Sequence, residues 1–400
     1  MKSSDSIKFP LYILMLNLFI ALLGQGMVIP ILPDYLKQFN AAGTAAGYLV
    51  AAFGVAQFLF SPIGGQLSDR LGRKRLIMAG LALTVISDLL FALSHTLTLL
   101  YIARFIGGMG LGLMVPSVMA YVADTTTPAA RAKGMGYLSA AMNLGMVLGP
   151  GLGGIIAQFG VRAPYFFASG LGLLATLLTI FMPESLPASQ RQLSRKQEKS
   201  EPVMNRIISS FRTSYFRYLL LILVMTFGLI NYETVYALFV QQKYGFNAGV
   251  ISIIITAGAI VGIIVQVWLL DKIVKLLGEI TLIRWSLIMA GIMLLLMLFK
   301  FNFAYLLAVS VLFFTFTSFL RPTVNTLISD AAGERQGYAS GLANTYSSAG
   351  TILGPVLAGS LFDKHIDLPY ILGAVILLAT VSITLNNRTT AGNERTAAHD

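Results

Sequence analysis

Twelve long apolar stretches separated by short polar breaks constrain this chain more than any other feature. A transmembrane helix needs about 20 predominantly apolar residues, and the chain is 56% hydrophobic but only 11% charged. Soluble domains carry about 25% charged residues. The sequence therefore predicts an all-α integral membrane protein. The twelve predicted spans are 9–33, 44–67, 75–97, 99–124, 131–158, 163–183, 215–242, 247–271, 279–300, 303–329, 335–361 and 367–387.

The basic residues predict how the chain is oriented in the membrane. Net charge is +11, which in a soluble protein would suggest nucleic-acid binding. Here the Lys and Arg residues gather in alternate turns, as they do on the cytoplasmic side of membrane proteins, so we expect no nucleic-acid partner. With both termini in the cytoplasm, five basic residues fall on the outer side: Lys37, Arg162, Lys243, Lys300 and Lys364. We therefore expect a multi-pass protein of a bacterial cell membrane with both termini inside.

A single long polar segment divides the chain into two halves. Residues 184–213 are rich in Ser, Gln, Lys and Arg, which is typical of a flexible cytoplasmic linker. The predicted domains are a six-helix bundle at 1–183, the linker at 184–213, and a second six-helix bundle with a short tail at 214–400.

The two halves repeat weakly. Gly145-x-x-x-Gly149-Pro150 recurs as Gly350-x-x-x-Gly354-Pro355, a spacing of 205 residues. Pro164-Tyr165 recurs at the same spacing as Pro369-Tyr370. Parallel six-helix repeats place a substrate site between the halves near the bilayer midplane.

The turn Gly64–Arg75, GGQLSDRLGRKR, lies between the second and third spans. A turn this short joins two membrane helices on one side, and its basic charge indicates the cytoplasmic side. The string resembles the loop between helices 2 and 3 of major facilitator superfamily transporters, G-x-L-a-D-r-x-G-r-k-x. That resemblance implies two pseudo-symmetric bundles and transport by alternating access.

The string Gly145–Gly154, GMVLGPGLGG, narrows the resemblance. Small residues let helices approach closely and proline bends a helix, so tight packing alone explains it as well as a hinge and seal does. It resembles the helix 5 motif of drug:proton antiporters in this superfamily. Nearly the whole chain resembles the twelve-helix multidrug efflux pumps of Gram-positive bacteria. This implies export of amphipathic, often cationic or zwitterionic aromatic compounds, such as fluoroquinolones and dyes, in exchange for protons.

Four of the charged residues inside predicted spans are candidates for proton coupling, because charge within the membrane is costly and usually functional. Glu233 is near the middle of its span, and a carboxyl there can load and release a proton as access alternates, or pair with a cationic drug. Arg104 matches an arginine of the resembled helix 4 motif, which implies proton transfer; an orienting role is the alternative. Asp88 is the weaker candidate, and a structural role is favoured. The expected proton-coupling residues are Glu233, Arg321, Arg104 and Asp88.

Helix 10 departs from the resembled pumps. They carry an Asp three residues before an Arg-Pro pair, where this chain has Ser318 before Arg321-Pro322. Serine cannot titrate, so Glu233 is left with Arg321 as its expected partner. The number of protons moved per drug is consequently open.

Polar and aromatic residues on the expected pore-facing helices form the predicted substrate site. Aromatic rings and methionine offer adaptable, stacking surfaces suited to many ligands. The set is Gln25, Phe53, Gln57, Asn143, Met146, Tyr232, Glu233, Tyr236, Phe316, Ser318, Phe319, Asn325 and Tyr346.

A further set is expected to control conformation. Asp69 lies at a helix end, where it can cap a helix N-terminus and pair with the neighbouring half. The set comprises Gly65, Asp69, Arg70, Gly72, Arg73, Asp124, Arg131, Gly145, Gly149, Pro150 and Gly154.

Other classes of function are disfavoured. No Walker A string occurs, and Gly107–Gly112 lies in an apolar helix with no preceding strand, which argues against a dinucleotide loop. The chain has no Cys and three His far apart, so we expect no cofactor, no metal and no enzyme activity. The expected partners are small-molecule drugs, protons and the lipid bilayer, with the chain acting as a monomer. The alternatives are a dedicated exporter of one metabolite, such as a polyamine or sugar, and a lipid or glycolipid flippase.

Overall fold

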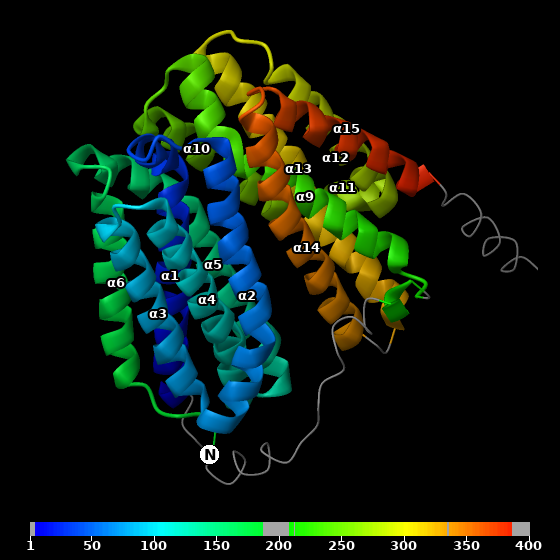
Figure 1. The fold of residues 1–400 in the computed structure, drawn as a ribbon. Coiled ribbons are helices and arrows are strands. Elements are labelled where there is room, and N and C mark those ends of the chain that lie inside the picture. Colours follow the sequence, from blue (N-terminus) through cyan, green and yellow to red (C-terminus); the bar gives the residue numbers. More distant parts are fainter. Residues whose placement is uncertain (1–4, 187–207, 212, 334–335, 386–400) are drawn as a thin grey trace, which may run out of the picture. The chain divides into compact units, whose positions relative to one another are not determined.

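The computed structural model describes residues 5–186, 208–211, 213–333 and 336–385, and these are almost entirely helical (Figure 1). The first group of helices comprises α1 (Asp5–Lys37), α2 (Gly43–Leu71), α3 (Arg73–Leu93), α4 (Leu97–Thr125), α5 (Pro128–Ile156) and α6 (Ala163–Ile180), with a 3-10 turn, η1 (Ala157–Phe159). The second group comprises α9 (Phe216–Tyr244), α10 (Ala248–Trp268), α11 (Leu270–Leu277), α12 (Glu279–Leu296), α13 (Phe303–Ala332), α14 (Gln336–Phe362) and α15 (Leu368–Leu385).

Each of the twelve predicted spans coincides with one of these helices, and α11 is the additional short helix. Within the described residues, ten helices are long and apolar enough to cross a membrane. The last helix adds a shorter apolar stretch, Leu368–Thr384. The helix α14 is 27 residues long, but its central sequence, Asn344–Ser348, is polar. An all-helical, multi-span membrane fold is therefore confirmed.

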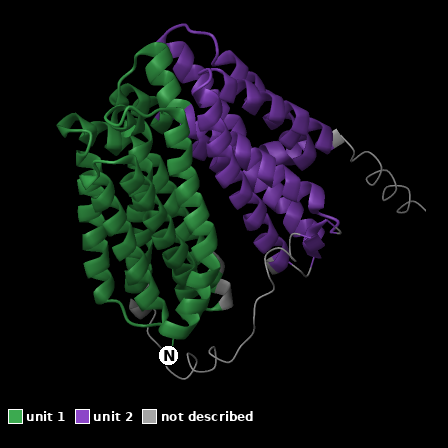
Figure 2. Ribbon diagram, in the orientation of Figure 1, with its two compact units in different colours: residues 1–200, 236–256 green, residues 201–235, 257–400 purple. Residues whose placement is uncertain are grey.

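By its internal contacts the chain separates into two compact units, coloured separately in Figure 2. Unit 1 comprises residues 1–200 and 236–256, and unit 2 comprises residues 201–235 and 257–400. The second part of α9 and the first part of α10 thus belong with unit 1. The predicted boundaries at residues 183 and 214 remain a prediction, and most of the predicted linker lies outside the described residues.

Glycines in unit 1 bring helix backbones into direct contact. A Cβ atom placed on Gly108 of α4 would collide with the carbonyl oxygen of Phe53 on α2. On α5, a Cβ on Gly149 would lie 2.7 Å from the carbonyl oxygen of Leu23 on α1. Lipid tails are as apolar as the helix surfaces, so close van der Waals packing at small residues replaces the hydrophobic effect as a driving force between helices.

The same packing recurs in unit 2. A Cβ on Gly350 would lie 2.7 Å from the carbonyl oxygen of Leu223, as one on Gly145 in unit 1 would meet the carbonyl oxygen of Phe19. A Cβ on Gly354 would lie 2.9 Å from the carbonyl oxygen of Phe227, which matches the contact of Gly149 in unit 1. The repeat noted in the sequence therefore places α14 on α9 as α5 is placed on α1.

This packing predicts opposite effects for two alanine substitutions on α5. Gly149→Ala should destabilise the protein by about 1–3 kcal/mol, because backbone atoms of α1 must move to admit the methyl group. Gly136→Ala is the matched control, because a Cβ there would meet nothing within 4 Å. It should be neutral or stabilise by up to about 1 kcal/mol through helix propensity. Thermal unfolding of the detergent-solubilised variants measures both effects, and equal melting temperatures would contradict the packing argument.

Candidate functional site

The turn between α2 and α3 is built around Gly72 and Arg73. Gly72 has a φ of 106°, a left-handed conformation that favours glycine, and it ends α2 and begins α3 without an intervening loop. This places Arg73 in the first turn of α3, where its side chain is only 8% exposed. Its guanidinium group pairs with Asp69 and with Asp124, the latter at 3.0 Å from Nε to Oδ2. Three helix ends therefore meet at one arginine.

The N-terminus of α3 is capped from a distant part of the chain. The backbone N–H of Arg73 donates to Oε1 of Glu184, at 2.9 Å. Asp69 was expected to cap a helix N-terminus, and within the described residues it instead pairs with Arg73 one turn along. The physical reason is that Asp69 still belongs to the last turn of α2, whereas the chain following α6 passes beside the free N–H groups of α3.

The other predicted residues of this turn lie close by. Asp124 also accepts a hydrogen bond from the hydroxyl of Ser185, at 3.2 Å. Arg131 donates to the carbonyl oxygen of Ala123, at 3.0 Å, and so joins the ends of α4 and α5. Arg70 is exposed, and Gly65 has open space where a side chain would be. The structure thus gathers Asp69, Arg73 and Asp124 into one cluster.

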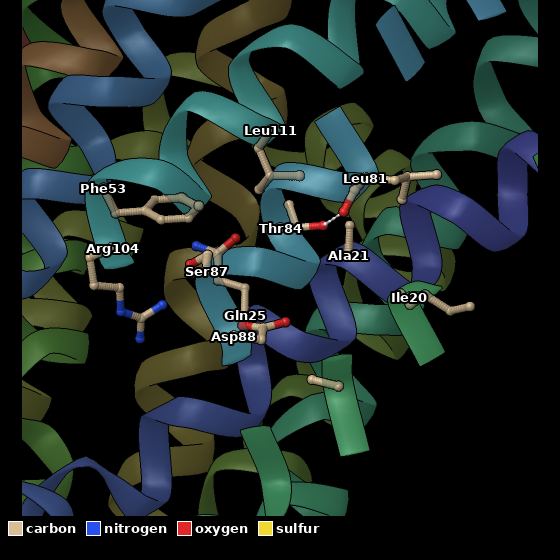
Figure 3. Close-up of a pocket in the computed structure, with 13 residues that line it drawn as sticks. Ile20, Ala21, Gln25, Phe53, Leu81, Thr84, Ser87, Asp88, Arg104 and Leu111 are labelled. Atoms are coloured by element: carbon tan, nitrogen blue, oxygen red, sulfur yellow. Dashed lines mark hydrogen bonds between the residues drawn. The ribbon is translucent and has the colours of Figure 1, made fainter. Parts of the chain in front are cut away.

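A second cluster surrounds a small cavity inside unit 1, between α1, α2, α3, α4 and α6 (Figure 3). Its volume is about 30 Å³. Its polar lining residues are Gln25, Thr84, Ser87, Asp88 and Arg104. A cavity of this size has room for about two water molecules and none for a drug-sized ligand, which needs at least about 300 Å³.

Local packing explains why this cavity is present. A Cβ on Gly107 of α4 would lie 2.6 Å from the Ser87 hydroxyl oxygen, so glycine lets α4 approach α3. The Ser87 hydroxyl donates to the carbonyl oxygen of Ala103, at 2.7 Å, which spans the same two helices. On the opposite side, a Cβ on Gly24 of α1 would lie 3.5 Å from Oδ2 of Asp88.

Arg104 is held by aromatic rings. Its Cζ atom lies 5.2 Å from the centroid of the Phe91 ring and 6.0 Å from that of Phe53, within the range of cation–π attraction. Among the described residues it forms no hydrogen bond to a backbone carbonyl, which was the alternative role considered for it. Asp88 lines the same cavity, and no ion pair between the two is present in the described part of the chain.

The string Gly145–Gly154, predicted to act as a hinge and seal, packs against two other helices within unit 1. Gly145 and Gly149 lie against α1, and Pro150 is buried beside Gly26. Gly154 lies against α10, where an added Cβ would meet the hydroxyl of Ser252 and lie 3.0 Å from the carbonyl oxygen of Ala248. One helix, α5, therefore carries small residues on two faces, toward α1 and toward the first part of α10.

Glu233 and Arg321 form no ion pair in the described part of the chain. Glu233 is partly buried on α9, and Arg321 is exposed on α13. The hydroxyl of Ser318 donates to the carbonyl oxygen of Thr315, at 2.8 Å, so it is satisfied within its own helix. A Cβ on Gly262 of α10 would lie 3.6 Å from the Cβ of Ser318, which places this serine at the contact between α10 and α13.

Three predicted substrate-site aromatics lie in packed clusters. Tyr232 is 3% exposed, and its ring centroid lies 4.3 Å from that of Phe313. Phe319, 4% exposed, packs in an apolar cluster with Val265 of α10 and Leu282 of α12. Tyr346 lies against the segment before α9, where its hydroxyl is 2.8 Å from that of Ser210.

The remaining predicted residues lie on separate helices. Gln25 and Phe53 share the cavity in unit 1 with Asp88 and Arg104. Tyr236 is buried, and Asn143 and Asn325 are exposed. The partly buried residues are Gln57, Met146 and Phe316.

Two contacts at helix ends were missed from the sequence. Glu184 directly follows the sixth span, where an acid can cap the N-terminus of another helix. The residue that it caps, Arg73, lies 111 residues earlier in the chain, so the sequence does not show the pairing. The second contact joins the ends of α1 and α9 within unit 1, where Gln241 donates to Oδ1 of Asp34, at 2.6 Å. No local pattern predicts a pairing between residues 207 apart.

Comparison with known proteins agrees with this architecture. A model of the Major Facilitator Superfamily matches residues 14–355 and 268–398. The chain is 40% identical over 378 residues to Multidrug resistance protein 1 of Bacillus subtilis (strain 168), covering 94% of this chain and 95% of that protein. It is 38% identical over 376 residues to Quinolone resistance protein NorA of Staphylococcus aureus (strain COL), covering 94% and 95%.

The fold is also that of solved transporters. The nucleoside transporter NupG superposes with a TM-score of 0.76 at 12% sequence identity, covering 94% of this chain and all of that one. At such low identity the likeness concerns the fold alone. Together with the full-length sequence matches, it establishes that this multi-span membrane protein, a transporter and not an enzyme, belongs to the major facilitator superfamily.

Proposed function

We propose that this transporter exports structurally diverse drugs in exchange for protons. The observation that carries the proposal is the match, over nearly the whole chain, to proteins named for multidrug and quinolone resistance. The expected substrates are amphipathic aromatic compounds that are cationic or zwitterionic, such as fluoroquinolones and dyes.

Coupling to protons is proposed from the charges within the membrane spans. Glu233 lies near the middle of α9, and among the described residues its carboxyl forms no ion pair. A carboxyl without a fixed partner is free to bind either a proton or a cationic drug, and the two then compete for one site. Competition of this kind couples drug release to proton uptake.

The proposed cycle places both termini in the cytoplasm and uses a single chain. The turn between α2 and α3 then faces the cytoplasm, which agrees with its basic residues. The contact between Asp34 and Gln241 falls at the outer ends of α1 and α9. Alternating access requires that contacts at these two ends form and break in turn.

Vesicle transport tests the proposal directly. The protein, reconstituted into liposomes with an imposed pH gradient, should move ethidium, a fluoroquinolone and a neutral dye against their gradients. Movement of labelled lipid alone would indicate a flippase. Saturable transport confined to one polyamine or sugar would indicate a dedicated exporter. Absence of any pH-driven dye movement would overturn proton-coupled drug export.

Glu233→Gln should abolish gradient-driven efflux while the protein still inserts and folds. Glutamine keeps the size and polarity of the side chain but cannot release a proton. Thr234→Val is the matched control on the same helix, because that hydroxyl donates only to the carbonyl oxygen of Ile230, at 2.6 Å. Dye efflux from liposomes of matched protein content provides the measurement. Retained pH-driven transport in the glutamine variant would exclude Glu233 as the coupling carboxyl.

Asp69→Asn should reduce turnover with little loss of stability, if Asp69 acts as a conformational latch. Its side chain is 46% exposed, whereas that of Asp124 is 25% exposed. Asp124→Asn is therefore the stability comparison, and loss of its charge beside buried Arg73 should cost roughly 1–3 kcal/mol. Spin-label distances between the halves should shift toward the inward-open state only for Asp69→Asn. A loss of drug affinity with unchanged distances would count against the latch.

Ser318→Asp should change charge selectivity, because it adds a second acid to the half that contains Glu233. A more negative interior should favour divalent over monovalent cationic dyes, while neutral substrates gain nothing. Ser318→Asn serves as the uncharged control of the same shape. Transport rates at several external pH values give the ratio of divalent to monovalent export. An unchanged ratio would mean that substrate charge is read elsewhere.

A further inference from the structure

The cavity in unit 1 combines features that the proposed drug site does not use. It is enclosed by helices of the first group alone, and its volume of about 30 Å³ admits water but no drug. It is lined by one carboxylate, Asp88, and one guanidinium group, Arg104. Figure 3 shows both side chains at the cavity with Gln25 and Phe53. A water-sized, charged cavity inside a membrane bundle suits protons better than organic solutes.

Two buried polar atoms on the helices that form this cavity lack a partner in the described part of the chain. They are Nε of Arg104 and the hydroxyl oxygen of Tyr165. Tyr165 is 2% exposed and stacks on Phe91 with ring centroids 4.3 Å apart. Arg104 approaches the same Phe91 ring, at 5.2 Å. Buried donors and acceptors are normally satisfied, and a water molecule in the cavity would satisfy Nε of Arg104, which lines it.

The groups that surround Asp88 leave it as the acid that can titrate here. From α4 it faces Arg104, and from α6 Tyr165 also interacts with it electrostatically. From α1 and α2 it faces Gln25 and Phe53, which carry no charge. Asp88 is the single carboxylate among the cavity-lining residues. Because Asp88 and Arg104 form no hydrogen-bonded ion pair, the carboxylate is not fixed in its charged form by geometry.

We propose that Asp88 is a second proton carrier of the transport cycle, located in the hydrated cavity of unit 1 with Arg104 as its counter-charge, and separate from Glu233. This inference rests on the proposed proton-coupled function. It supplies a second titrating carboxyl in a chain whose helix 10 has Ser318 at the position where the resembled pumps have an acid.

The chemistry is a single proton transfer. A hydronium ion that reaches the cavity donates a proton to a carboxylate oxygen of Asp88, which becomes a neutral carboxyl, and the hydronium is left as a neutral water molecule. Arg104 remains protonated throughout. The net charge of the pair therefore alternates between zero and +1, and the attraction between α3 and α4 falls when Asp88 is protonated. Proton occupancy is thereby converted into a change in the strength of a helix contact.

Proton release on dye binding tests this assignment. Purified protein in weakly buffered detergent is mixed with ethidium, and released protons are followed with a pH indicator. Asp88→Asn should release roughly half as many protons as the wild type, if two carboxyls contribute equally. Glu233→Gln should lose the other share. Asp271→Asn, an exposed acid on α11, is the matched control and should release as many as the wild type.

The outcomes separate the two proposals. If wild-type protein releases no protons and shows no pH-driven dye transport, proton coupling itself fails. If wild-type protein is proton-coupled but Asp88→Asn releases as many protons as the wild type, the second-carrier assignment alone is overturned.

If Asp88→Asn does not fold, infrared difference spectroscopy of another variant tests whether Asp88 gains a proton. Spectra recorded between acidic and alkaline pH report the C=O stretch of carboxyls that gain a proton. Asp88→Glu keeps the acid but changes the length of its side chain, so the band from this site should move. Identical carboxyl bands in Asp88→Glu and wild-type protein would show that Asp88 does not titrate, and would overturn the proposal. A moved band that Glu233→Gln leaves intact would support it.

Discussion

Direct backbone contact between helices is the constraint on which the rest of this structure depends. In hydrocarbon, burying apolar side chains against one another gives little net advantage, so helices associate where their backbones can touch. Gly108 against Phe53, and Gly149 against Leu23, are contacts that any larger residue would prevent. These contacts fix how far apart the helices lie. They thereby determine which polar side chains meet inside the bundle and which small cavities remain.

The charged groups follow from that framework. A glycine at position 107 lets α4 approach α3 closely, and the cavity that holds Asp88 and Arg104 lies beside this approach. At the end of the same bundle, Gly72 makes a turn so tight that Arg73 enters the fold and needs two acids, Asp69 and Asp124, to balance its charge. Both polar clusters therefore lie beside a glycine, whose lack of a side chain lets two helices approach closely or lets the chain turn tightly. Their charges are retained because each has an opposite charge or an aromatic face nearby.

Sequence patterns predicted the helices, which the structure confirms, whereas the substrate-site residues remain a prediction. Apolar length defines a membrane span almost without reference to its neighbours, and every predicted span coincides with a helix. Which face of a helix points inward depends on its neighbours. Phe319 and Tyr232 were predicted to face a substrate, and the structure packs them against other apolar side chains. The cap of α3 by Glu184 could not be predicted either, because helix ends distant in sequence meet only after the bundle has formed.

The two halves share their packing but not their charges. Gly72 and Gly278 both have positive φ and each immediately precedes a helix, α3 in one unit and α12 in the other. The residue that follows this glycine is Arg73 in the first half and Glu279 in the second. By contrast, the acid near the end of α4, Asp124, is matched by an acid near the end of α13, Asp330. The pair of Arg73 and Asp124 thus corresponds to two acids in the second half, while Asp69, the other acid beside Arg73, corresponds to Lys275. Like charges at a helix end weaken the local fold unless a cation approaches them. The repeat has preserved its glycines and its architecture while reversing the signs of the charges that flank this turn.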